Sequence, residues 1–102
     1  VKWSLAELMV LVGSWTGWCE PFTEMQRVPG HASACWAEVP VRSGIAEEFQ
    51  ILVAGDWKRR FFPMEANKIN AHILGPLDRH GYNFARRVPP SCELMCVIWD
   101  PV

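Results

Sequence analysis

Two tryptophans that stand beside turn residues are the side chains in this sequence best suited to contact a ligand. Trp18 closes residues 13–17, which begin with Gly-Ser, and Trp57 follows the turn formed by residues 54–56. A sugar ring presents axial C–H groups that pack against a flat indole, while a nearby amide can bind its hydroxyls. Two such tryptophans on one surface would bind a glucan without any reaction.

Packing is the default role for a tryptophan, and this chain has six of them. Large aromatic side chains commonly fill a core or an interface, so each is first expected to pack. Six are more than a core of this size readily hides, which favours an exposed aromatic surface. The six are Trp3, Trp15, Trp18, Trp36, Trp57 and Trp99.

No arrangement of residues in the sequence predicts catalysis or a bound metal. His31, His72 and His80 are scattered, and no HxxxH or CxxC spacing is present. No serine stands in a G-x-S-x-G turn, and no glycine-rich loop precedes a helix that could hold a phosphate. We therefore expect a protein that is not an enzyme and that needs neither a cofactor nor a metal.

The four cysteines match no compact disulfide or zinc framework. Cys92 and Cys96 would lie about 13 Å apart on one face of a strand, which is too far for a disulfide. We expect buried free thiols at all four positions, which are Cys19, Cys35, Cys92 and Cys96. No asparagine begins an N-x-Ser/Thr glycosylation sequence. A reducing compartment, intracellular or organellar, is therefore favoured over secretion.

The composition indicates one folded domain over residues 1–102. Hydrophobic residues make up 50% of the chain and charged residues 21%, close to the globular average. The formal charge of −1 is too small for nonspecific nucleic-acid binding, so no nucleic-acid partner is expected. The longest uncharged stretch, residues 8–19, is shorter than the about 20 apolar residues of a spanning helix. We expect no transmembrane segment, and leave open peripheral membrane association through a larger complex.

Short apolar runs separated by turn residues predict strands. A strand is expected over residues 8–12, and the alternative is a helix that begins at Ser4, because Ser4 and Glu7 have capping-box spacing. Residues 13–30 are expected to be mostly loop, since prolines and glycines interrupt them. The clearest pattern is a hairpin over residues 47–62. Further strands are expected at residues 34–41, near 71–74, at 83–88 and at 92–99.

The last of these strands has apolar residues on both faces, and we expect both faces to be covered. One face carries Cys92, Leu94, Cys96 and Ile98, and the other carries Glu93, Met95, Val97 and Trp99. About seven short strands with frequent turns and no long helical period predict an all-β fold. The expected architecture is an Ig-like antiparallel β-sandwich.

Two motifs give the chain a family resemblance. They are Val10-Leu11-Val12-Gly13-Ser14-Trp15-Thr16-Gly17-Trp18, and Glu48-Phe49-Gln50-Ile51-Leu52-Val53-Ala54-Gly55-Asp56-Trp57 followed by Pro63. In order, spacing and intervening length they resemble the glycogen-binding domain of the AMP-activated kinase β subunit and its starch-binding relatives. The resemblance covers residues 8–63 well and the remainder loosely. It implies a non-catalytic carbohydrate-binding module that binds an α-glucan, glycogen or starch.

The resemblance also implies a role for individual residues. Trp18 matches the first sugar-stacking tryptophan and Trp57 the second, while Asn83 matches an asparagine that hydrogen-bonds sugar hydroxyls. Gln50 stands where the family has a sugar-contacting lysine, and it could bind a hydroxyl in its place. Ala54 replaces the aspartate of the family's turn.

A structural or accessory subunit is the alternative function. The same sandwich serves as a docking surface in larger protein assemblies, and a fold does not fix a function. The motifs also resemble domains of algal plastid proteins, which would place such a subunit in a plastid photosynthetic membrane complex. Trp18 and Trp57 exposed in one plane beside Gln50 would favour sugar binding, and their burial would favour docking. The basic run over residues 58–60, together with Arg86 and Arg87, is either a solvated edge or a contact to an acidic partner or a lipid headgroup.

Overall fold

The computed structural model of the chain describes residues 7–65 and 72–100. Within these residues the regular elements are nine strands and one 3-10 turn. In chain order they are β1 (Met9–Gly13), η1 (Ser14–Thr16), β2 (Thr23–Glu24), β3 (Gln26–Arg27), β4 (Cys35–Pro40), β5 (Ala46–Val53), β6 (Arg60–Pro63), β7 (Ile73–Leu77), β8 (Phe84–Arg87) and β9 (Leu94–Trp99). Trp3 and the helix start considered at Ser4 lie outside the described residues.

The larger sheet is built around β5. β1 pairs antiparallel with one edge of β5, and β2 extends the sheet beyond β1. Two strands share the opposite edge, because β8 pairs with residues 46–49 of β5 while β6 pairs with Ile51 and Leu52. β7 pairs with β6 and completes this sheet. Gln50 therefore falls where one partner of β5 ends and the next begins.

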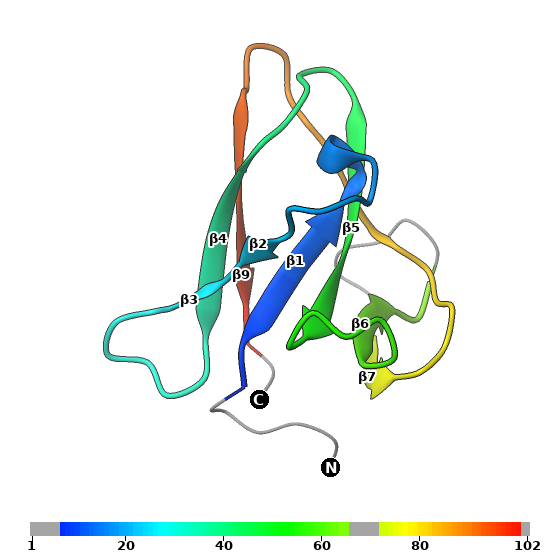
Figure 1. Cartoon of the computed structure of the whole chain (residues 1–102). Helices are drawn as coiled ribbons and strands as arrows, with labels where there is room; N and C mark the ends of the chain where they lie inside the picture. The colour runs from blue at the N-terminus through cyan, green and yellow to red at the C-terminus, as the bar shows by residue number, and fades with distance from the viewer. Residues whose placement is uncertain (1–6, 66–71, 101–102) are drawn as a thin grey trace.

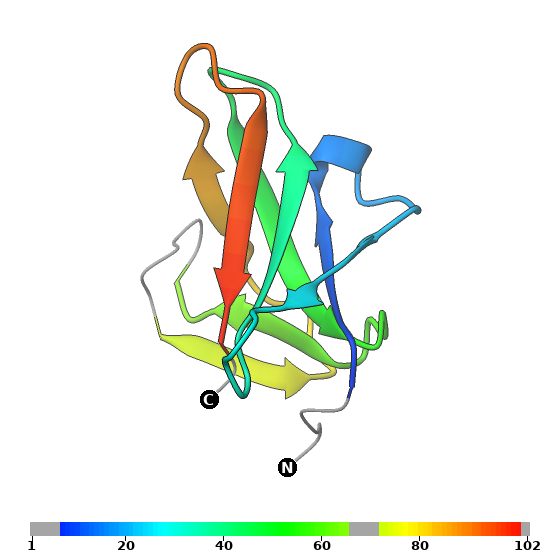
Figure 2. The same cartoon turned by 90° about the vertical axis from the view of Figure 1, so that its left-hand side faces the viewer.

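A second sheet, β3–β4–β9, packs across the first, and together they form an antiparallel β-sandwich (Figures 1 and 2). Alternate residues of each strand point into the space between the sheets. From β5 these are Phe49, Ile51 and Val53, all buried. Trp99 of β9 meets Phe61 of β6, with ring centroids 4.8 Å apart. The main core thus lies between the sheets, and the outer face of the larger sheet faces away from it.

The structure confirms the all-β antiparallel sandwich, and the part of the chain that it describes has nine strands where about seven were expected. The two additional strands, β2 and β3, lie in the segment expected to be loop. Each is two residues long, and they belong to different sheets. Met25 stands between them, is buried, and donates its N–H to the carbonyl of Met9. The chain crosses between the sheets here, and backbone pairing on either side of the crossing makes the two short strands.

The expectation that both faces of the last strand are covered is wrong for the described chain. Met95, Val97 and Trp99 face the core, whereas Leu94, Cys96 and Ile98 on the other face are exposed. Ile98 is 71% exposed. The sandwich has two layers, and no described element packs over the outside of the three-stranded sheet. No helix among the described residues is long and apolar enough to cross a membrane.

All four cysteines are free, as expected, but only Cys35 is buried. Cys19 and Cys96 are exposed, and Cys92 is half-buried. The prediction of buried thiols is therefore wrong at three positions. Burial raises the pKa of the Cys35 thiol and outweighs the opposing effect of the nearby Arg27 cation.

Candidate functional site

The outer face of the larger sheet carries a small apolar cluster that supports the two predicted tryptophans. Val10, Val12 and Leu52 are buried on this face, opposite the main core. They are covered by three aromatic side chains, Trp18, Phe22 and Trp57, which remain partly exposed. Both tryptophans are therefore packing residues on one side and surface residues on the other.

Trp18 is placed by a turn that follows directly on β1. The 3-10 turn η1 ends at Thr16 and is capped by Gly17, whose φ of 64° lies in the left-handed region. Trp18 has the same φ of 64°, a conformation that is uncommon for a bulky residue and costs about 1–2 kcal/mol. The N–H of Trp18 donates to the carbonyl of Gly13 at 3.1 Å. This bond closes the loop and brings Trp18 back over the sheet.

Trp57 is placed by the tight turn between β5 and β6. Ala54 and Gly55 both have positive φ, of 55° and 71°, as type I′ hairpin turns require. The N–H of Asp56 donates to the carbonyl of Val53 at 3.0 Å and closes the turn. The predicted hairpin is confirmed, although an alanine occupies the first left-handed position.

The two tryptophan rings contact each other but do not lie in one plane. The ring centroids of Trp18 and Trp57 are 6.5 Å apart, and the rings are tilted by 48°. Phe22 packs edge-on against Trp57, with centroids 6.0 Å apart. The guanidinium of Arg60 lies 5.3 Å from the centre of the Trp57 ring, and Arg60 Nε donates to the Trp57 carbonyl at 2.6 Å. The coplanar platform that would have favoured sugar binding is absent, and the rings instead form a V.

Gln50 lies beside the tryptophans in the gap between β8 and β6. Its side chain points to the outer face and is 2% exposed. Gln50 Nε2 lies within hydrogen-bond distance of three acceptors, the carbonyls of Gly81 and Tyr82 and Asn83 Oδ1, at 3.3, 3.1 and 3.1 Å. Gln50 Oε1 is buried and has no hydrogen-bond partner among residues 7–65 and 72–100. A buried acceptor without a partner costs about 1–3 kcal/mol unless a donor reaches it.

Asn83 is joined to Gln50 and to β5 by both ends of its amide. Asn83 Oδ1 accepts from Gln50, and Asn83 Nδ2 donates to Glu48 Oε1 at 3.0 Å. Residues 81–83 run directly into β8, so the pairing of β8 with β5 sets their position. The predicted site residue Asn83 is thus held next to Gln50.

These side chains line one cavity of about 290 Å³, near the lower end of the range for small-molecule sites. All four residues predicted for the site, Trp18, Trp57, Gln50 and Asn83, line this cavity. Sequence reasoning missed Arg60 and His80, which also line it. A signal for Arg60 was available: the hairpin register places it opposite Leu52, whose side chain lies on the outer face.

The chemistry available in this cavity is stacking, hydrogen bonding and one positive charge. Among the described residues that line it there is no carboxylate. Across residues 7–65 and 72–100 no cluster of three or more His, Cys, Asp or Glu side chains could hold a metal. The cavity has the features of a binding site.

Glu47 is the most deeply buried acidic residue of the chain. It supports the site from the other face of β5. Arg42 Nη2 donates to Glu47 Oε1 at 2.9 Å, and the Arg42 N–H donates to Oε2 at 3.0 Å. Burial acts to raise the pKa of Glu47, but the hydrogen bonds from Arg42 and from the Ser14 hydroxyl outweigh it and lower the pKa below its ordinary value. Glu47 is therefore ionised and structural.

Comparison with protein-family models, with curated proteins and with solved structures finds no match to this chain.

Proposed function

We propose that this domain is a non-catalytic α-glucan-binding module whose site is the cavity between Trp18, Trp57, Gln50 and Asn83. The observation that carries the proposal is the unpartnered, buried Gln50 Oε1 beside two half-buried indoles. A sugar ring supplies what this arrangement lacks, because its hydroxyl groups donate hydrogen bonds and its C–H face packs on an indole.

The V formed by the two rings sets how much of a glucan the site holds. A cavity of about 290 Å³ bounded by rings 6.5 Å apart is too small to lay two sugar units on two separate platforms. We therefore place one glucose unit over the open side of the V formed by Trp18 and Trp57, with a hydroxyl on Gln50 Oε1. The rest of the chain of sugars would run outward over the half-exposed edge of the site.

Titration with a linear maltooligosaccharide, followed by calorimetry and by tryptophan fluorescence, tests this function. We expect saturable binding that Trp57→Leu weakens at least tenfold, which corresponds to about 1.4 kcal/mol. Leucine at this position still covers the apolar cluster below it. Trp36→Leu is the matched control, because Trp36 is also half-buried but lies on β4 in the other sheet.

Docking into a larger protein assembly is the second candidate function. The observation that favours it is the packing around Trp57, since Phe22 and Arg60 both contact this ring and reduce the face open to a sugar. In that case the V of Trp18 and Trp57 receives a protein side chain, in an assembly such as a plastid photosynthetic membrane complex. A folded domain that gives neither heat nor a fluorescence change with any maltooligosaccharide would replace the glucan proposal with this one.

A further inference from the structure

The open edge of β9 plays no part in the proposed sugar site. β9 lies at the end of the three-stranded sheet, and among the described residues only β4 pairs with it (Figure 2). The N–H of Val41 donates to the carbonyl of Glu93 at 2.9 Å, in the register of the β4–β9 ladder. Because backbone groups of an antiparallel strand alternate in direction, Leu94, Cys96 and Ile98 turn their N–H and C=O groups to the open edge.

This edge lacks the features that usually protect an edge strand. The sequence of β9 is LMCVIW, with no charged residue and no proline. It pairs with β4 through six consecutive residues without a register shift, so no bulge twists it away. Native proteins usually protect a long apolar edge by one of these means or cover it. The edge of β9 therefore has the properties of a surface that another strand covers.

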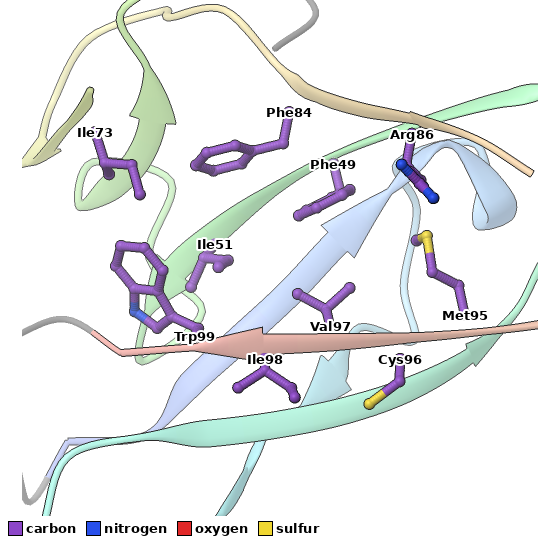
Figure 3. Close-up of a pocket in the computed structure, with 10 residues that line it drawn as sticks. All are labelled: Phe49, Ile51, Ile73, Phe84, Arg86, Met95, Cys96, Val97, Ile98 and Trp99. Atoms are coloured by element: carbon purple, nitrogen blue, oxygen red, sulfur yellow. The ribbon is translucent and has the colours of Figure 1, made fainter. Parts of the chain in front are cut away.

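Apolar surface lies on both sides of the edge. On the outside, Leu94 is 59% and Ile98 71% exposed, and Cys96 lies between them. On the inside, a cleft of about 240 Å³ opens between the sheets along β9. Figure 3 shows its apolar lining, with Phe84 and Phe49 on the larger sheet facing β9.

The described lining of the cleft includes one charged side chain, which lies near one end of β9. Among the described residues that line the cleft, Arg86 of β8 is the only charged one, and it lies at the Met95 end of β9 (Figure 3). The opposite end of β9 leads into Asp100. The edge thus has a cation near its start and a carboxylate just beyond its end.

We propose that β9 is the interface of a two-fold dimer of this chain, in which the β9 strands of two copies pair antiparallel about Cys96. In this register Cys96 faces Cys96 of the second copy, and Leu94 faces Ile98 of the second copy. The outward backbone groups of all three residues find partners, and their apolar side chains join into one continuous stripe on the outer face of the joined sheet, where each shields part of its neighbour. The two clefts meet across the axis and close each other.

The charges at the ends of β9 suit this pairing. In the register centred on Cys96, Glu93 stands opposite Trp99 of the second copy, and Asp100 opposite Cys92 of the second copy. No two carboxylates therefore face each other. Asp100 of the second copy, which in its own chain accepts from Ser33 Oγ at 2.6 Å and lies 3.7 Å from His31, is brought to the end of the strand at which Arg86 lies, so the two ends that come together carry opposite charges.

Sedimentation velocity over a range of protein concentrations tests the proposal. We expect a reversible dimer that Ile98→Lys weakens at least tenfold, because it places a cation in the stripe and leaves the core untouched. Leu94→Lys, on the facing residue, should have the same effect. Leu8→Lys is the matched control, since Leu8 is 42% exposed but precedes β1 in the other sheet.

Cross-linking with a short bismaleimide identifies the surface that associates. The exposed thiols are Cys19 and Cys96, so we expect a covalent dimer that persists in Cys19→Ser and is lost in Cys96→Ser. A monomer at all concentrations would overturn the proposal, as would a dimer that Ile98→Lys leaves unchanged and that cross-links through Cys19. Neither result depends on sugar, so this proposal and the glucan proposal can fail separately.

Discussion

The hydroxyl of Ser14 joins the turn that carries the first tryptophan to the buried start of β5. Ser14 Oγ donates to Glu47 Oε1 at 2.8 Å and accepts from the N–H of Glu48 at 2.9 Å. Ser14 opens the turn that ends at Gly17, immediately before Trp18. A buried carboxylate on one face of the sheet thus fixes the loop that reaches the site on the other face.

Replacing Glu47 with glutamine should destabilise the domain by about 1–3 kcal/mol at pH 7, because the bonds to Arg42 and Ser14 lose their charge-assisted strength. The pKa of Glu47 is lowered on folding, so its stabilisation is present above the unfolded value of about 4.3 and is lost as pH falls through the lower folded value. Urea unfolding of both proteins between pH 7 and pH 3 measures this. The gap in unfolding free energy should shrink below about pH 4, and a gap constant in pH would rule out the ionic role.

Replacing Gln50 with methionine should remove binding and also lower stability. The thioether has nearly the same shape but donates no hydrogen bond, so the carbonyls of Gly81 and Tyr82 lose their donor at a cost of about 1–3 kcal/mol. Calorimetric titration and urea unfolding measure the two effects. Asn83→Ala is the companion variant, since it removes one acceptor of Gln50 and leaves Oε1 in place. If Gln50→Met bound maltooligosaccharide as tightly as the parent, Gln50 Oε1 would have no role in the site.

A side chain at Gly81 should disturb the site by steric overlap. A Cβ atom at Gly81 would overlap the ring of Phe62, which is buried at 1% exposure and cannot move aside. We expect Gly81→Ala to cost about 1–3 kcal/mol and to displace the carbonyls that hold Gln50.

Gly44→Ala separates this overlap from ordinary backbone strain. Gly44 has a φ of 77° with open space around it, so alanine there costs only about 1–2 kcal/mol and lies away from the cavity. Thermal unfolding and sugar titration of both variants distinguish them. Equal loss of affinity in the two variants would contradict the steric explanation.

The four thiols should react in the order of their exposure. We expect Cys19 and Cys96 to be modified quickly by a thiol reagent, Cys92 more slowly, and Cys35 only after unfolding. Burial raises the pKa of Cys35 and so also reduces the fraction of reactive thiolate. Mass spectrometry of peptides after timed labelling gives the four rates. Labelling of Cys35 at the rate of Cys19 would show that the sheets separate readily.

Strand positions were predictable from the sequence wherever apolar residues alternate between turns. The hairpin of β5 and β6 is the clearest case, because residues 54–56 supply its turn and Phe49 begins its alternation. The crossing at Met25 was not predictable, since two-residue strands have no period of their own. The exposed face of β9 was also missed, because an apolar residue looks the same in sequence whether a partner layer covers it or not.

The candidate site was predictable in its residues and not in its geometry. The two motifs identified Trp18 and Trp57, and the structure places both in one cavity with Gln50 and Asn83. The tilt of the two tryptophan rings depends on how they pack over Val10 and Val12, and a sequence motif contains no information on this packing. His80 was missed for the same kind of reason, because only tertiary structure brings it to β5.

The break in pairing along β5 has a consequence for synthesis of the chain. Trp18 and Trp57 have both been synthesised once the β5–β6 hairpin is complete. The acceptors that hold Gln50 belong to residues 81–83, which are synthesised later. A chain that is released before residues 81–83 are made would expose the indoles of Trp18 and Trp57 and the Gln50 amide. Exposed apolar surface of this kind is what chaperones recognise. The candidate site therefore forms only after residues 81–83 have joined β5, and a truncated chain that ends soon after Trp57 would lack it.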